Sequence, residues 1–264
     1  RVRRQRQMCI RDRRTTYSRK IKLMKLVYLY HSGFALLGEG YTIVFDYFED
    51  SRSTDKGILH DEILSREGRL YVLASHSHYD HFNREVLSWS ARRPDIVYVF
   101  SCDIQLSAGE TRSRTIHWME KGDVFQDDFL EIRAFGSTDI GVSFLVKVEG
   151  KTVFHAGDLN NWHWMDESPE AEWKHDEAFF LRELEDIATY TNRMDVVLFP
   201  VDPRLGREYM RGPVQFVKRI KTAIFVPMHF DEAYAKAEAF VPLAAQEGTR
   251  VWVPAHRGQQ TDLD

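Results

Sequence analysis

The chain has 264 residues, 43% hydrophobic and 29% charged, which is typical of a globular protein and long enough for one large α/β domain or two small ones. No apolar run approaches the length of a membrane span, and the basic first residues lack the apolar core of a signal peptide. We therefore expect neither a membrane protein nor an exported one. Two cysteines, Cys9 and Cys102, cannot form a disulfide framework, which favours a cytoplasmic location.

Charge is unevenly distributed along the chain. Residues 1–23 hold ten of the 36 Lys/Arg residues and one of the 40 acidic residues, so the remainder has a net charge near −13. This acidic remainder makes nucleic acid an unfavourable partner, because phosphate neutralisation needs a basic surface. Residues 4–13 show no hydrophobic periodicity, and a back-translation of residues 6–13 resembles a transposase end sequence used in preparing sequencing libraries.

We therefore expect residues 1–23 to be a non-native or disordered basic extension, with Met24 as the natural start and residues 24–264 forming a single domain. The alternative for residues 1–23 is a native basic tail that contacts nucleic acid.

Strands dominate the first half of the predicted structure. Apolar, β-branched and aromatic runs between turn residues predict strands at 26–30, 34–37, 42–46, 70–74, 96–101, 115–119, 129–134, 142–148 and 151–155. A short helix is expected at 83–90, and Glu149-Gly150 favours a hairpin between the last two strands.

The second half alternates between helices and strands. Helices are predicted at 170–189, 213–221 and 232–246, and strands at 196–199, 223–226 and 251–253. This order suits two sheets packed face to face with helices outside, so the expected fold is a four-layer αββα sandwich of the α/β class.

The segment SHSHYDH, Ser75–His81, directly follows a predicted buried strand. Alternate side chains of an extended segment lie on the same side, so His76 and His78 can face one metal ion, and a bend can direct Asp80 and His81 to a second. Imidazole and carboxylate are ligands of Zn²⁺, and two adjacent ions can activate a shared water at neutral pH. We expect one or two Zn²⁺ ions, with Mn²⁺ or Fe²⁺ as alternatives. A histidine-rich surface loop is the competing interpretation.

The order of motifs resembles a known family. HSHYDH at 76–81 is similar to the motif H-x-H-x-D-H of the metallo-β-lactamase superfamily. HSGF (31–34), VFHAGDLN (153–160) and FVPMHF (225–230) resemble the branch that contains L-ascorbate-6-phosphate lactonase and related metal-dependent hydrolases. The resemblance covers the chain after Leu23 and implies the αββα sandwich, with a binuclear site at one edge of the two sheets.

The resemblance also implies roles for single residues. Asp158 would bridge the two ions, and His229 would bind the second ion together with Asp80 and His81. Asp80 and Asp158 would be the catalytic residues that orient the attacking water. Most members place a further histidine before the bridging aspartate, but residues 135–144, FGSTDIGVSF, contain none. Asp139 is a candidate replacement; otherwise the first site is weak and completed by water, or the enzyme binds one ion.

Several side chains near the predicted strand ends are candidates for binding a substrate. These are His31, Asn161, His163, Trp164, Arg204, Arg207 and His256. An arginine there can bind a phosphate or carboxylate of the substrate. Structural roles are the alternative, such as an ion pair with Asp202 that fixes the loop around Arg204. His155 should point away from Asp158 by strand alternation, so packing or a role in supporting the ligands is expected rather than binding of the metal itself.

The expected function is hydrolysis of a small-molecule ester, lactone or phosphoester by a metal-bound hydroxide. One alternative is a nucleic-acid phosphodiesterase of the same fold, which the acidic surface disfavours. The other is a catalytically degraded protein of this fold that only binds a metal or ligand. The absent histidine before Asp158 is the observation behind that alternative.

Overall fold

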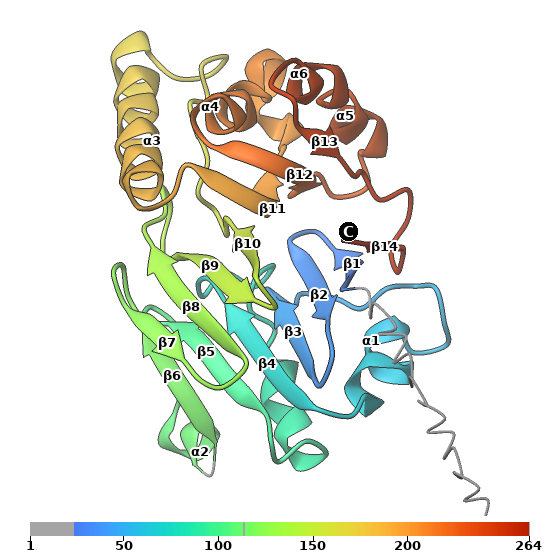
Figure 1. Ribbon diagram of the computed structural model, residues 1–264. Coiled ribbons are helices and arrows are strands. Elements are labelled where there is room, and N and C mark those ends of the chain that lie inside the picture. The colour runs from blue at the N-terminus through green and yellow to red at the C-terminus, as the bar shows by residue number, and fades with distance from the viewer. Residues whose placement is uncertain (1–23, 113, 264) are drawn as a thin grey trace, which may run out of the picture.

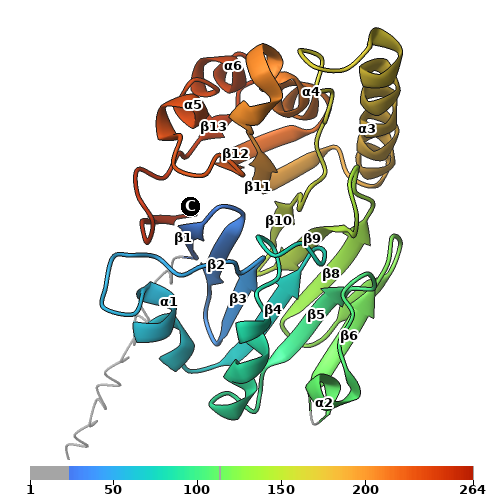
Figure 2. The same ribbon diagram turned by 180° about the vertical axis from the view of Figure 1, so that it is seen from behind.

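The computed structural model describes residues 24–112 and 114–263. The expectation for residues 1–23 lies outside the described residues and stays a prediction. Two seven-stranded sheets pack against each other in the described part of the chain, with helices on both outer faces (Figures 1 and 2). The predicted four-layer αββα sandwich is therefore confirmed. No helix in the described ranges combines the length and apolar character needed to cross a membrane.

The first sheet has the strand order β14-β1-β2-β3-β4-β5-β6. Pairing is antiparallel from β14 to β3 and parallel from β3 to β6. Its strands are β1 (Lys25–Tyr30), β2 (Gly33–Leu37), β3 (Tyr41–Phe45), β4 (Arg69–Ala74), β5 (Val97–Ser101), β6 (Thr115–Met119) and β14 (Gln260–Asp262).

The second sheet repeats this plan, with the order β13-β12-β11-β10-β9-β8-β7. It is antiparallel from β7 to β10 and parallel from β10 to β13. Its strands are β7 (Val124–Gln126), β8 (Leu130–Phe135), β9 (Ser143–Val148), β10 (Lys151–His155), β11 (Arg193–Pro200), β12 (Lys221–Met228) and β13 (Arg250–Val251). Glu149 and Gly150 have φ values of 50° and 77°, as a two-residue hairpin requires, so the predicted hairpin is confirmed.

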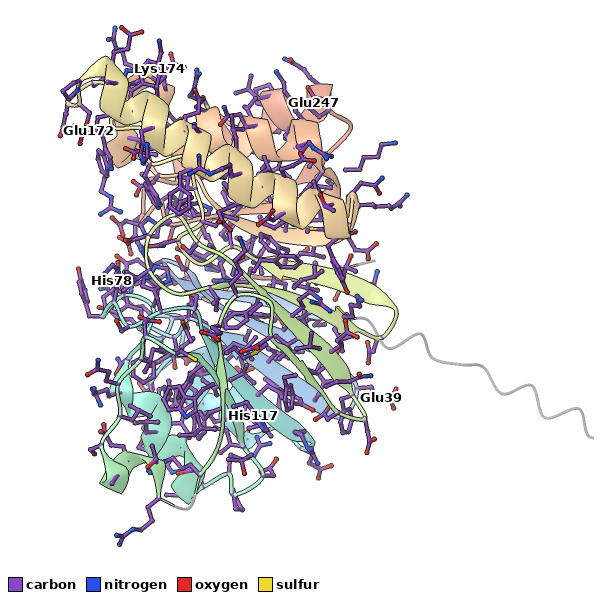
Figure 3. The ribbon with its side chains drawn as sticks, turned by 90° about the vertical axis from the view of Figure 1, so that its left-hand side faces the viewer. Glu39, His78, His117, Glu172, Lys174 and Glu247 are labelled. Carbon is purple, nitrogen blue, oxygen red and sulfur yellow. The ribbon has the colours of Figure 1, made fainter. Side chains whose placement is uncertain are left out.

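Helices enclose the sheets on both sides, as the edge-on view in Figure 3 shows. The second sheet is covered by α3 (Glu170–Tyr190), α4 (Arg211–Arg219), α5 (Tyr234–Glu238) and α6 (Val241–Gln246). The first sheet is covered by α1 (Ile58–Asp61) and the 3₁₀ helices η1 (Ile63–Ser65) and η2 (Arg84–Ala91). The remaining helices are α2 (Ala108–Thr111) and the 3₁₀ helix η3 (Pro203–Glu208).

Alternation along the strands of the first sheet builds two separate cores. In β4, Tyr71 and Leu73 face the second sheet, whereas Leu70 and Val72 pack beneath η1 and η2. All four side chains are at most 1% exposed. The sequence of a strand that is buried on both faces is a continuous apolar run, and this burial fixes the register in which the strand pairs with its neighbours.

Some predicted elements differ from the structure. The helix predicted over 232–246 is wrong as one element, because it divides into α5 and α6. Pro242 lies in the first turn of α6, where it lacks the N–H that a continuous helix would need. The helix predicted at 83–90 is present as the 3₁₀ helix η2. The short strands β7 and β14 were not predicted, since each depends on a partner strand rather than on its own pattern.

Candidate metal centre

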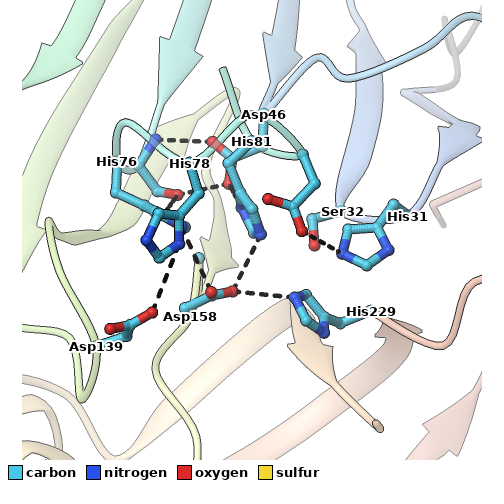
Figure 4. A network of polar contacts seen from close by, with 12 residues as sticks. His31, Ser32, Asp46, His76, His78, His81, Asp139, Asp158 and His229 are labelled. Atoms are coloured by element: carbon cyan, nitrogen blue, oxygen red, sulfur yellow. Dashed lines mark hydrogen bonds and ion pairs between the residues drawn. The ribbon is translucent and has the colours of Figure 1, made fainter. Parts of the chain in front are cut away.

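The carboxyl ends of strands from both sheets meet at one edge of the sandwich and carry the site (Figure 4). The histidine cluster follows β4, Asp158 follows β10 and His229 follows β12. Gly157 has a φ of 53°, and a Cβ at this position would lie 2.7 Å from the Cβ of Ser75. Glycine therefore allows the end of β10 to approach the end of β4 and brings Asp158 to the histidines.

The turn after β4 is held by hydrogen bonds. The N–H of Ser77 donates to Asp103 Oδ2 (2.8 Å), and the N–H of His81 donates to the carbonyl of His78 (3.0 Å). This bend directs Asp80 and His81 away from His78, which separates the potential ligands into two sets. Figure 3 shows His78 at the edge of the molecule.

Two groups of side chains have donor atoms close enough to hold an ion. We call His31, Asp80, His81 and His229 the inner group, and His76, His78, Asp139 and Asp158 the outer group. Within each group, one donor atom from every member lies within 4.8 Å of the others. All metal ligands suggested by the sequence therefore belong to one of the two groups, Asp139 included. His31, predicted as a substrate contact, instead joins the inner group.

Asp158 lies between the two groups. Its Oδ1 is 3.1 Å from His81 Nε2 and 3.4 Å from His229 Nε2, whereas its Oδ2 is 3.4 Å from His76 Nε2 (Figure 4). Each carboxylate oxygen thus faces a different group. This is the arrangement needed for one carboxylate to bridge two cations.

Buried acids orient the imidazoles of the inner group. Asp46 Oδ2 lies 2.7 Å from His81 Nδ1, and Asp202 Oδ2 lies 2.9 Å from His229 Nδ1. A carboxylate at Nδ1 fixes the imidazole tautomer and leaves Nε2 for a metal ion. Burial alone would raise the pKa of Asp202, but the contacts with His229 and Arg204 lower it to about 2, so this carboxylate is ionised at neutral pH.

The pKa values of the ligand side chains reflect their close packing. Burial alone would raise the pKa of Asp158, but His81 and His229 hold it well below its usual value. Burial lowers the pKa of His76 to about 4. Burial and the nearby Asp158 carboxylate raise the pKa of Asp139. At neutral pH, Asp158 is thus an anion and His76 a neutral imidazole, the forms that bind a cation.

The residues present fit a metal ion. His31 Nε2, His81 Nε2 and Asp158 Oδ1 are buried and have no hydrogen-bond partner. Buried polar atoms in native proteins are nearly always satisfied, so this concentration of orphaned atoms requires an explanation. Imidazole nitrogen and carboxylate oxygen are the ligands of Zn²⁺, Mn²⁺ and Fe²⁺, and an ion held between these atoms satisfies all three.

A pocket of about 580 Å³ opens onto both groups. Its wall includes four aromatic side chains, Tyr79, Trp162, Trp164 and Phe179, together with Arg204. Two of the candidate substrate contacts, Trp164 and Arg204, thus line this pocket.

The other predicted substrate contacts lie away from this pocket. Asn161 is buried and donates to Glu177 and Gln215, and both ring nitrogens of the buried His163 contact backbone groups. Arg207 is 88% exposed and pairs with Asp166, and His256 is exposed with Nδ1 near the carbonyl of Arg257. These four residues thus have structural or surface positions and do not line the pocket.

Sequence reasoning missed two acids that orient ligands, Asp46 and Asp231. Asp46 directly follows the apolar strand β3 and is fully buried, and Asp231 Oδ1 lies 2.9 Å from His31 Nδ1. An acid that terminates an otherwise apolar strand was the available signal for Asp46. His155 belongs to neither group, as expected: its ring stacks on Phe45, and its Nε2 lies 2.8 Å from the carbonyl of Ser32.

Comparison with known proteins places this geometry in a family. The family model of the beta-lactamase superfamily domain matches residues 25–172. A UPF0173 metal-dependent hydrolase of Carboxydothermus hydrogenoformans is 23% identical over 218 residues, which are 79% of this chain and 85% of the relative. A second UPF0173 metal-dependent hydrolase, from Thermoplasma acidophilum, is 23% identical over 244 residues, 88% of this chain and 95% of the relative.

Among solved structures, the fold is similar to that of Igni18, a metallo hydrolase from the archaeon Ignicoccus hospitalis. The TM-score is 0.65 at 20% identity, covering 90% of this chain and 97% of Igni18. The similarity supports the fold, and the family match includes both the histidine cluster and Asp158. Since this match covers more than half of the sequence, the chain belongs to the beta-lactamase superfamily.

Proposed function

We propose that the protein is a metal-dependent hydrolase acting on a small ester, lactone or phosphoester, with Zn²⁺ as the expected ion and Mn²⁺ or Fe²⁺ as alternatives. The observation that carries the proposal is the Asp158 carboxylate, whose two oxygens face two converging groups of donors beside a pocket. Divalent ions bound there would polarise the substrate and lower the pKa of a water ligand to near neutrality. The names of the two curated relatives agree with this activity.

Asp80 and Asp158 are the residues suited to orient the attacking water. Both line the pocket, and the pKa of each is held below its usual value by neighbouring histidines, although burial alone would raise it. Ionised carboxylates in this position can accept a hydrogen bond from water and then take up its proton.

The position of Arg204 favours a substrate that carries a negative charge. Its Nε and Nη2 donate to Asp202, and Nη1 makes no hydrogen bond to the residues that the structure describes. Since Arg204 lines the pocket, Nη1 is available to a phosphate or carboxylate. The aromatic wall of Tyr79, Trp162, Trp164 and Phe179 suits an apolar or planar part of the same molecule. An anionic lactone or ester meets both requirements, which agrees with the expected lactonase-like branch.

Asp139 favours an enzyme over the degraded, non-catalytic alternative. Its Oδ2 lies 3.6 Å from His78 Nδ1, so the outer group has four donors even without the usual histidine. The carboxylate therefore supplies the donor whose absence suggested a degraded site.

The test is a hydrolysis assay on a panel of lactones, phosphodiesters and simple esters, each with added Zn²⁺ or Mn²⁺. We expect metal-dependent turnover that Asp80→Ala removes. Asp55→Ala serves as the matched control and should retain full turnover, because Asp55 is an exposed acid that belongs to neither group and does not line the pocket. A wild-type protein that binds two ions but hydrolyses nothing on the panel would instead support a binding protein.

A further inference from the structure

The histidines in the described part of the chain differ in what their two ring nitrogens contact. His60 contacts Asp50 through Nδ1 and Glu85 through Nε2, at 2.7 and 2.6 Å. The buried His155 and His163 likewise use both nitrogens within the protein. Each of these three histidines, which lie outside both groups, therefore has a protein partner at both ring nitrogens.

His31 shows a different pattern, shared with the inner-group ligands His81 and His229. Its Nδ1 lies 2.9 Å from Asp231 Oδ1, just as Asp46 and Asp202 contact the Nδ1 atoms of the other two. Its Nε2 is buried without a hydrogen-bond partner, 3.4 Å from Asp80 Oδ2. Three imidazoles of one group are thus oriented by three separate carboxylates, with Nε2 turned inward each time.

Three separations among the inner group and Asp158 match those between the ligands of a single ion. Donors about 2.1 Å from a common centre lie roughly 3.0–3.4 Å apart at angles of about 90–110°. The distance from His31 Nε2 to Asp80 Oδ2 is 3.4 Å, and those from Asp158 Oδ1 to His81 Nε2 and His229 Nε2 are 3.1 and 3.4 Å. His31 therefore occupies a ligand position, on the opposite sheet from His229 (Figure 4).

The backbone maintains this arrangement at a conformational cost. His31, His229 and Asp231 have φ values of 55°, 63° and 51°, a region that non-glycine residues rarely adopt. The N–H of His229 donates to the carbonyl of His31 at 3.3 Å, which joins the β1–β2 turn to the end of β12. Such unfavourable conformations concentrate at functional sites, where the surrounding structure imposes them.

We propose that His31 is a metal ligand positioned by Asp231, and that it gives the inner group five protein donors when Asp158 is counted. The outer group has four donors, two of them carboxylates, and His78 and Asp139 are exposed. The inner position consequently binds a divalent cation more tightly and fills first, and the outer position holds the exchangeable ion. This inference rests on the metal site of the proposed function and adds a ligand and an order of loading.

Chelator-treated protein titrated with Zn²⁺ tests the order by calorimetry, with metal content measured on the same samples. We expect two equivalents of unequal affinity in the wild type. Loss of an orienting partner usually lowers metal affinity roughly 10–100-fold, and we expect a loss in this range for the tighter Zn²⁺ equivalent in Asp231→Asn. His31→Ala removes the ligand itself and should lower that affinity by more. His175→Ala replaces an exposed histidine of α3 and should leave both equivalents unchanged.

X-ray absorption of the protein loaded with one equivalent gives a second readout, the number of imidazoles per ion. We expect three in the wild type and His175→Ala, and two in His31→Ala. A folded His31→Ala protein with an unchanged first dissociation constant and imidazole count would overturn the assignment while leaving the proposed hydrolase intact. If His31→Ala fails to fold, Asp231→Asn provides the test instead. An unchanged first dissociation constant for Zn²⁺ in Asp231→Asn would likewise overturn the assignment. A wild type that binds no Zn²⁺ contradicts the proposed function itself.

Discussion

Asp46 Oδ2 lies 2.7 Å from His81 Nδ1, and both side chains are inaccessible to solvent. The same oxygen accepts a hydrogen bond from the Ser75 hydroxyl at 2.6 Å, and Asp46 Oδ1 accepts one from the N–H of Ser75 at 2.7 Å. Asp46 thereby joins the ends of β3 and β4 and sets the orientation of a ligand imidazole. Burial alone would raise its pKa, but His155 and His81 lower it, so the carboxylate remains charged at neutral pH.

Replacing Asp46 should weaken metal binding without removing a ligand. In Asp46→Asn, an amide oxygen can still accept one of the Ser75 bonds, but the negative charge that orients His81 is lost. We expect the affinity of the tighter Zn²⁺ equivalent to fall roughly 10–100-fold, the usual effect of an orienting partner. Competition with a chelator measures this directly.

Asp195 provides a matched control for that substitution. Its Oδ2 accepts the N–H and the hydroxyl of Thr152 at 2.8 and 2.9 Å, which repeats the Asp46–Ser75 motif away from the site. Asp195→Asn should therefore affect stability but not Zn²⁺ affinity. Equal Zn²⁺ affinities in the two variants would show that Asp46 acts only on the fold.

The two acids of the outer group should differ in what they control. Asp158 faces both groups, whereas Asp139 contacts only His78 among the ligands. After dialysis at a free Zn²⁺ concentration at which the wild type keeps two equivalents, Asp158→Asn should retain no ion, because each ion loses a donor and the shared negative charge. Asp139→Asn should retain one equivalent. Two tightly bound equivalents in Asp139→Asn would exclude Asp139 as the replacement for the usual histidine.

The sequence was most informative where ligands directly follow strands. The cluster at 76–81, Asp158 and His229 each come after an apolar run, and the ends of parallel strands meet at one edge of a sheet pair. Local order therefore indicated the fold and the ligands at 76–81, whereas the roles of Asp158 and His229 were implied by the family resemblance. Asp139 was also identified, since few donors occur in residues 135–144.

Contacts between distant residues could not be predicted in this way. His31 and Asp231 are 200 residues apart, and nothing in HSGF indicates which acid it meets. The difference between Arg204 and Arg207 also depends on conformation: Gly206 has φ 79° and ψ −143°, which interrupts η3 between them. The chain turns there, so Arg204 reaches the pocket and Arg207 pairs with Asp166 on the surface.

This difference yields a test of the anionic substrate. Arg204→Gln should raise KM for an anionic ester or lactone roughly 10- to 100-fold, the effect of losing a hydrogen bond to a charged group worth about 1.5–3 kcal/mol. Zn²⁺ content, measured in parallel, shows whether Asp202 still orients His229. Arg207→Gln is the control and should leave KM unchanged. Equal KM values for Arg204→Gln and the wild type would mean that Arg204 does not bind the substrate.

A histidine between two acids, outside both groups of the metal centre, should make stability depend on pH. His60 lies between Asp50 and Glu85, with ring nitrogens 2.7 and 2.6 Å from their carboxylate oxygens. Asp50 also accepts the N–H groups of Leu59 and His60, so the ion pairs reinforce the start of α1. Burial lowers the pKa of His60, but the hydrogen bonds to Asp50 and Glu85 outweigh it and raise the pKa above its usual value.

Because the pKa of His60 is higher in the folded protein than in the unfolded chain, folding favours the protonated imidazole. Its stabilisation is fully present below the unfolded pKa of about 6.5 and is lost as the pH rises through the folded value. His60→Gln should therefore reduce the free energy of unfolding more at pH 6 than at pH 9. Urea unfolding of the wild type, His60→Gln and the exposed control His175→Gln at both pH values measures the difference. A His60→Gln effect of the same size at pH 6 and pH 9 would show that the imidazole contributes through packing rather than charge.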